Sequence, residues 1–209
     1  RKRKMNRLMT LTAALLLTAA TATAQTGAEA KVARGIAEAH AAMSEMRCPY
    51  TLERKVKMLA DVATESGTLT YVKATRTLTL ASATADTTIM TPRAITTANA
   101  RGRNTADARR NAALRQMLDI VGACFTGDFA PARQAGTLTT TDGGATTTMT
   151  FTPKDKRALR HISSIELTFG NDDYGLRQMT VWQPGGDFLR YTFGRKKTTR
   201  QANRAGGGI

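Results

Sequence analysis

The sequence predicts an α+β protein in which a strongly curved antiparallel sheet, an incomplete β-barrel, has helices covering its open, concave face. Two segments, 29–46 and 105–122, repeat apolar residues at three- and four-residue steps, which is typical of amphipathic helices. The stretches between and after these segments, such as 50–58, 164–169 and 189–193, alternate apolar and polar residues and are separated by turn residues. The chain lacks the strand–helix–strand order of a parallel sheet. Placing both helices against one face of the sheet buries both apolar stripes.

The segment 29–46 is expected to be the first helix, followed by an extended segment after Pro49. From residue 50 the apolar period changes to two, which predicts a strand with one buried face. Ser66-Gly67 is expected to break this strand. The helical stripe comprises Val32, Ile36, Ala39, Met43 and Met46, and the strand alternates through Tyr50, Leu52, Val56 and Met58.

Further strands are expected at 69–71, 77–80, 87–90 and 93–97. The second helix, 105–122, follows them. Its stripe is Leu114, Met117, Leu118 and Val121, with Asn104 or Thr105 as a possible cap and Gly122 as its end.

Strands return after the second helix and continue nearly to the end of the chain. Turn residues at 142–144, 171–173 and 184–186 separate them, and residues 164–169 and 189–193 alternate apolar with polar side chains. Residues 198–209 are expected to form a disordered basic tail.

Residues 1–24 have the pattern of a signal peptide: cations, a short apolar run from Leu8 to Leu17, and Ala22-Thr23-Ala24 at the cleavage position. The sequence therefore predicts export to the periplasm, with residues 25–197 as a single domain. The net charge of +15 includes five cations in this leader, so the mature chain carries about +10. Aromatic residues make up only 5% of the chain, which argues against stacking on nucleic acid.

No arrangement of residues indicates catalysis or a metal site. The two histidines, His40 and His161, have no cysteine or carboxylate at ligand spacing, and Asp172-Asp173 is better explained as a turn. We therefore expect no enzyme activity, no cofactor and no metal. The cations between Lys154 and Arg160 form either an anion-binding patch or a solvated loop.

The two cysteines, Cys48 and Cys124, suit a disulfide in an exported protein. Closing so long a loop would stabilise the fold by about 4–5 kcal/mol. Two separate buried thiols are the alternative.

Several short segments resemble, in order and spacing, the LolA family of periplasmic outer-membrane lipoprotein carriers. The similarity spans residues 32–197. The segments are Met46–Leu52, Gly67–Ala74, Phe151–Lys154, Ile165–Phe169, Leu176–Met179 and Gly186–Phe188.

This chain departs from the family pattern at three places. Ala74 stands where the family has proline, Lys73 where well-known members have arginine, and the plain strand Arg76–Leu80 where the family has aromatics. Lysine keeps the charge of arginine but not its planar fork, so the resemblance implies a lid latch at Lys73 of altered geometry.

The resemblance implies a monomeric carrier that takes acylated lipoproteins from an inner-membrane exporter to an outer-membrane acceptor. Two alternatives keep the chain in the envelope, as a lipid or lipoprotein sensor of the same fold or as a structural secreted β protein without a ligand. A third is a secreted hydrolase with an unrecognised site. The expected cavity-lining residues are Tyr50, Leu52, Leu69, Tyr71, Leu78, Leu80, Leu114, Met117, Leu118, Val121, Met149, Phe151, Ile165, Leu167 and Phe169.

Overall fold

The computed structural model describes residues 27–57 and 61–200 of the chain. The expected leader, Met58 and the last nine residues lie outside this part. Residues 27–39 are helical and are called the N-terminal helix below. No helix in the two described ranges is long and apolar enough to cross a membrane.

The described strands form one antiparallel sheet in the order β6-β5-β4-β3-β2-β1-β11-β10-β9-β8-β7, with β12 also paired to β1. The strands are β1 (Met43–Lys55), β2 (Val62–Val72), β3 (Thr77–Ser82), β4 (Thr87–Thr91), β5 (Ala94–Asn99), β6 (Gly102–Asp107), β7 (Gly136–Asp142), β8 (Thr146–Pro153), β9 (Ser164–Gly170), β10 (Leu176–Trp182), β11 (Phe188–Phe193) and β12 (Lys197–Arg200). The remaining helices are η1 (Ala108–Arg110), α2 (Ala112–Thr126), α3 (Ala130–Ala135) and η2 (Ala158–Arg160).

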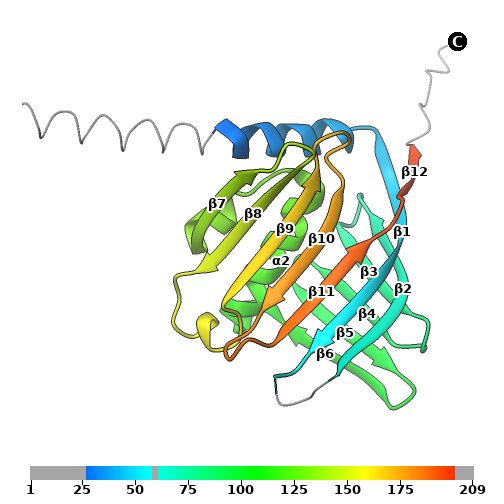
Figure 1. Cartoon of the computed structure of the whole chain (residues 1–209). Helices are drawn as coiled ribbons and strands as arrows, with labels where there is room; N and C mark the ends of the chain where they lie inside the picture. The colour runs from blue at the N-terminus through cyan, green and yellow to red at the C-terminus, as the bar shows by residue number, and fades with distance from the viewer. Residues whose placement is uncertain (1–26, 58–60, 201–209) are drawn as a thin grey trace, which may run out of the picture.

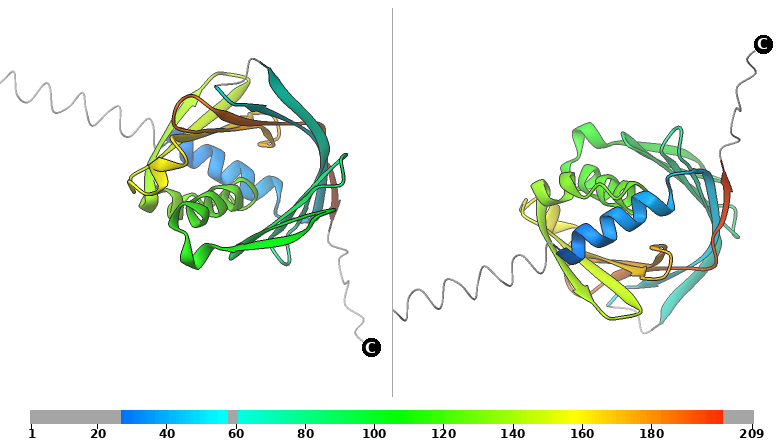
Figure 2. Two further views of the ribbon diagram at one scale, coloured as in Figure 1. Left: turned by 90° about the horizontal axis from the view of Figure 1, so that it is seen from below. Right: turned by 90° about the horizontal axis from the view of Figure 1, so that it is seen from above.

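The sheet curls around α2 without closing, because its two edges, β6 and β7, do not pair with each other. Figure 1 shows the N-terminal helix lying across one end of the curved sheet, and Figure 2 shows α2 inside the curve. The predicted incomplete antiparallel β-barrel with helices on its concave face is therefore confirmed. The predicted turns at 142–144, 171–173 and 184–186 join β7–β8, β9–β10 and β10–β11.

Alternation along the strands explains the core. In β8 and β9, every second residue is buried, and the buried set includes Met149, Phe151 and Leu167. In β8, threonines take the intervening positions, where β-branched side chains suit a half-solvated pleat. The buried side chains meet those of α2 in one apolar cluster.

The first predicted helix is too long, since the chain turns at 40–42 and β1 begins at Met43. The register between β1 and β12 shifts between Met43 and Glu45. A bulge adds one residue to a strand and reverses its alternation, so Met43 and Met46 are both buried. Their three-residue spacing therefore imitates a helix.

The predicted break at Ser66-Gly67 is also wrong, because both residues pair with β1 inside β2. A Cβ atom on Gly67 would overlap the backbone oxygen of Ala81 and the ring of Tyr50. Glycine is needed here for the close approach of a neighbouring side chain rather than for a turn.

The second helix begins later and ends later than predicted. Residues 102–107 form the edge strand β6, so neither Asn104 nor Thr105 caps a helix. Instead, the Asn111 side chain accepts a hydrogen bond from the Leu114 N–H, and Gly127, at a φ of 75°, ends α2. The short helix α3 was not anticipated.

The expected disordered tail begins too early. Residues 197–200 form β12, which pairs with Met43–Arg47 of β1. Beside it, β1 changes partner from β12 to β11, and the Gly194 N–H donates to the Pro49 carbonyl at 2.9 Å. Proline is tolerated inside β1 at this irregular position of the sheet.

Candidate ligand-binding site

A cavity of about 120 Å³ lies between α2 and the adjoining ends of β2, β3 and β4. We call it the mouth cavity. Its floor is apolar, and its rim carries one cation, two carboxylates and two threonines. The floor comprises Tyr71, Leu78, Met90, Leu118, Val121 and Phe125, and the rim includes Arg76, Thr91, Asp119, Thr126 and Asp128.

A second, entirely apolar cavity of about 20 Å³ shares four side chains with the mouth cavity and leads toward β10 and β11. We call it the inner cavity. It has room for about one water molecule. The shared side chains are Leu78, Met90, Val121 and Phe125. The two cavities therefore form an apolar track from the rim into the lumen, the space inside the curved sheet. Most of this lumen is filled by α2.

All fifteen predicted lining residues lie in one core cluster or pack against it. Tyr71, Leu78, Leu118 and Val121 border the mouth cavity, and Leu69 and Leu80 join Leu78 and Val121 at the inner one. Tyr50 borders an open hollow over β1, β2 and β3. The rest pack in the core outside these cavities: Leu52, Leu114, Met117, Met149, Phe151, Ile165, Leu167 and Phe169. Ligand contact at each of the fifteen stays a prediction.

Several lining residues were missed from the sequence, and two of them, Phe125 and Met90, border both cavities. Phe125 continues the helical stripe one turn beyond the expected end of α2, and its ring stacks on Tyr71 at 4.2 Å between centroids. The spacing of residues 118, 121 and 125 would have found it, had Gly122 not been taken as the helix end. Met90 lies in a strand of five residues, β4, which is too short for its alternation to show which face Met90 occupies.

Asp119 is the half-buried carboxylate at the rim. Burial raises its pKa above the ordinary value, and Asp128 acts in the same direction, whereas the nearby Arg115 opposes them. A further negative charge close to Asp119 is therefore unfavourable, whereas Arg76 supplies a positive charge at the rim of the mouth cavity.

Lys73 binds the turn that directly follows the N-terminal helix. Its Nζ donates to the carbonyls of His40 at 2.8 Å and Ala41 at 2.6 Å. A cation at a helix C-terminus also interacts favourably with the helix dipole. Lys73, the predicted lid latch, thus bonds backbone carbonyls directly after the N-terminal helix, and not the backbone of α2.

The N-terminal helix has two further polar contacts. His40 Nδ1 lies 3.1 Å from the Phe125 carbonyl at the end of α2, and Glu29 forms an ion pair with Arg133 of α3 at 2.6 Å. The helix therefore connects β2, α2 and α3, the elements around the mouth cavity.

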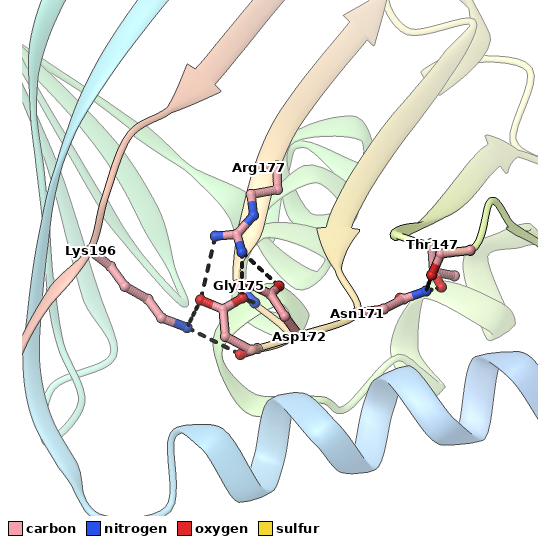
Figure 3. A network of polar contacts seen from close by, with 8 residues as sticks. Thr147, Asn171, Asp172, Gly175, Arg177 and Lys196 are labelled. Carbon is pink, nitrogen blue, oxygen red and sulfur yellow. Dashed lines mark hydrogen bonds and ion pairs between the residues drawn. The ribbon is translucent and has the colours of Figure 1, made fainter.

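A polar network supports the turn between β9 and β10, on which the N-terminal helix rests (Figure 3). Asp173 forms ion pairs with Arg177 at 2.8 Å and Lys196 at 3.1 Å. Burial opposes ionisation of Asp173, but the Gly175 N–H and these two cations outweigh it and hold its pKa below the ordinary value. The next residue, Tyr174, has a φ of 50°, and its ring packs against Gly35 of the helix.

The expected disulfide is not formed, and Cys48 and Cys124 are both buried free thiols. Cys124 lines the inner cavity, and its Sγ donates to the Ile120 carbonyl at 3.3 Å. Cys48 faces the core from β1, paired with Leu69. Burial raises the pKa of Cys48 to about 11 and that of Cys124 to about 12, so neither is a reactive thiolate near neutral pH. Within 27–57 and 61–200, no three His, Cys, Asp or Glu residues are grouped to hold a metal.

No family model and no curated protein matches the sequence. Solved structures with a similar fold include a Pseudomonas aeruginosa MucA/MucB complex, with 13% identity, a TM-score of 0.46, and coverage of 84% of this chain and 59% of the other. A putative outer membrane lipoprotein-sorting protein domain from Vibrio parahaemolyticus has 6% identity, a TM-score of 0.45, and coverage of 81% and 92%. A LolA superfamily protein from Nitrosomonas europaea has 7% identity, a TM-score of 0.39, and coverage of 81% and 94%.

The structural neighbours thus include proteins of the LolA superfamily, whose family pattern the sequence resembles. At these identities the likeness concerns the fold alone. The chain spans 59% of the matched chain in the MucA/MucB complex.

Proposed function

We propose that this chain is an envelope carrier that binds the acyl chains of lipoproteins in the lumen of its half-barrel. It would receive them from an inner-membrane exporter and deliver them to an outer-membrane acceptor. The observation that supports this proposal is the apolar track from the mouth cavity to the inner cavity, in a chain that begins with a predicted export signal.

The size of the cavities determines how a ligand would enter. Sites for small molecules usually occupy roughly 300–1,000 Å³, whereas the mouth cavity has about 120 Å³ and the inner one about 20 Å³. An acyl chain therefore fits only after α2 moves away from β2 and β3. The described structure is therefore a closed conformation, in which the lumen is too narrow for an acyl chain.

In a carrier, this closed conformation would also favour release of the cargo. Burying an acyl chain of about 15 methylenes at ~0.8 kcal/mol each offers up to ~12 kcal/mol. Restoring the contacts between α2 and the sheet, including the Tyr71–Phe125 stack, offsets part of this free energy. The carrier then binds firmly and still transfers its cargo to a tighter acceptor.

The test is native mass spectrometry of the processed protein with a triacylated lipopeptide and with its deacylated form. We expect stoichiometric binding that requires the acyl chains. A Cβ at Gly122 meets no atom within 4 Å, and this residue lines the mouth cavity. Gly122→Trp should therefore obstruct binding, whereas Thr97→Trp, at an exposed position of β5, should not.

Absence of acyl-dependent binding in a folded protein would refute the carrier proposal. Equal binding by the two tryptophan variants would show that the ligand binds outside the mouth cavity. The first result would favour the structural envelope protein as the alternative.

A further inference from the structure

The two large apolar side chains that are exposed among the described residues lie on the same rim of the sheet. They are Val62, 43% exposed, and Leu159, 36% exposed. Val62 pairs with Lys55 at the β1–β2 turn, and Lys55 also pairs with Phe188 after the β10–β11 turn. The lower part of Figure 1 shows the β10–β11 turn and the adjoining ends of β1 and β2 at the end of the sheet opposite the N-terminal helix.

Hydrogen bonds connect the loops of this rim. The Ser163 N–H, in the β8–β9 connection, donates to the Trp182 carbonyl at 2.8 Å, and the Lys57 N–H donates to the Asp187 carboxylate at 2.6 Å. The β8–β9 and β10–β11 connections and the described residues 55–57 and 61–62 beside them therefore form one surface, which we call the lower rim.

The β8–β9 connection concentrates positive charge around Leu159. Its four cations, Lys154, Lys156, Arg157 and Arg160, are exposed. None forms an ion pair with a carboxylate in the part of the chain that the structure describes. The one acidic residue nearby, Asp155, accepts a hydrogen bond from the Arg157 backbone N–H.

Buried side chains anchor the β8–β9 connection to the core. Ala158, the first residue of the short helix η2, is fully buried, and Ile162, which follows this helix, is nearly so. The segment therefore presents Leu159 outward together with its cations. Charge alone would suit any acidic partner, but an exposed leucine among cations also suits the boundary between headgroups and acyl chains.

We propose that the lower rim docks on an anionic lipid bilayer. Lys154, Lys156, Arg157 and Arg160 contact lipid phosphates, and Leu159 enters the interface, with Val62 as a second apolar contact. The mouth cavity lies beside the β2–β3 turn, at the opposite end near the N-terminal helix. Docking through the lower rim therefore leaves the mouth cavity free for a protein partner.

The test is flotation of the processed protein with vesicles of phosphatidylethanolamine, alone or mixed with phosphatidylglycerol. We expect binding only to the mixed vesicles, and weaker binding as salt screens the charges. Each cation removed should weaken binding about fivefold, so the double variant Lys156→Gln/Arg157→Gln should lose about 25-fold. Leu159→Ser should weaken binding and leave its salt dependence unchanged.

The matched control is Lys31→Gln/Arg34→Gln, which removes the same charge from exposed positions of the N-terminal helix. It should bind mixed vesicles like the unmodified protein. Equal loss in both double variants would show that only net charge acts and would overturn the proposal, as would absence of binding to either vesicle. Because the vesicles contain no lipoprotein, the result is independent of the carrier proposal.

Discussion

At the scale of single residues, Lys73 is the side chain whose role the structure defines most clearly. Its ammonium group satisfies two carbonyls at the end of the N-terminal helix, where the backbone has no further partners within the helix. The side chain itself is exposed, so the interaction is screened by solvent. Its contribution to the free energy of unfolding should therefore be small, and its effect should be confined to the end of the N-terminal helix.

We expect Lys73→Met to lower the free energy of unfolding by about 1 kcal/mol, measured by urea denaturation. Hydrogen exchange at the amides of residues 36–41 should become faster. Lys73→Arg should restore most of the stability, because the charge returns to the same helix end. Lys154→Met, at an exposed lysine without a helix carbonyl to bind, should change neither quantity, and equal effects of Lys73→Met and Lys154→Met would contradict the assignment.

His40 couples the N-terminal helix to α2 in a manner that depends on its protonation state. Burial is the main reason that its pKa lies below the ordinary value, and Lys196 and Lys73 act in the same direction. The Phe125 carbonyl and Asp173 oppose them. In the neutral ring, Nδ1 donates to Phe125, while Nε2 is buried and has no partner among the described residues.

The sign of the pH effect follows from this lowered pKa. The unfolded chain takes up a proton near the ordinary value of 6.5, before the folded protein does. The free energy of unfolding should therefore fall as the pH drops below about 6.5. In urea denaturation between about pH 7 and about pH 5, His40→Gln should flatten this dependence, whereas exposed His161→Gln should leave it unchanged. An unaltered slope in His40→Gln would assign the acid sensitivity to other groups.

At the scale of elements, the N-terminal helix depends on a close crossing. A Cβ atom at Gly35 would overlap the ring of Tyr174 in the β9–β10 turn. That turn is fixed by the Asp173 network, so it cannot easily move away. The helix therefore lies on the end of the sheet only because residue 35 has no side chain.

Two helical glycines provide a matched comparison. Gly35→Ala should lower the free energy of unfolding by about 1–3 kcal/mol through overpacking. Gly122→Ala adds the same methyl group to α2, where it meets nothing within 4 Å, and should be neutral or stabilise by up to about 1 kcal/mol. Thermal and urea denaturation would measure both, and equal effects would show that helix propensity alone decides.

At the scale of the whole molecule, the carrier proposal requires a movement, because the lumen is closed. The sheet is continuous from β1 through β11 to β7, whereas α2 bridges the unpaired edges β6 and β7 through short connections. Strands held on both sides by hydrogen-bonded neighbours should stay in place when a ligand enters. The mobile part should therefore be α2.

We expect an acylated lipopeptide to speed hydrogen exchange at the amides of α2, on the order of tenfold, because it displaces the packing of this helix. The amides of β8 and β9 should keep their protection, and the deacylated peptide should change neither set. Faster exchange throughout the sheet would instead indicate general destabilisation. Unchanged exchange in α2 would contradict the opening movement.

The sequence by itself determined the antiparallel strands, their turns, the apolar faces and the presence of helical stripes. These features depend on periodicity and turn chemistry, which are local properties of the chain. For the same reason, thirteen of the fifteen predicted lining residues are buried, and the other two, Leu114 and Met117, pack against that core.

Only the tertiary structure decided the boundaries and the contacts between distant segments. The bulge in β1 gave Met43 and Met46 a helix-like spacing. Glycine is required at position 67 because the Tyr50 ring of the neighbouring strand lies against it. The two thiols remained apart although their sequence context suited a bridge. The lumen was filled by Phe125 and its neighbours on α2. In each case the deciding energy comes from residues far apart in the chain, and no local pattern records it.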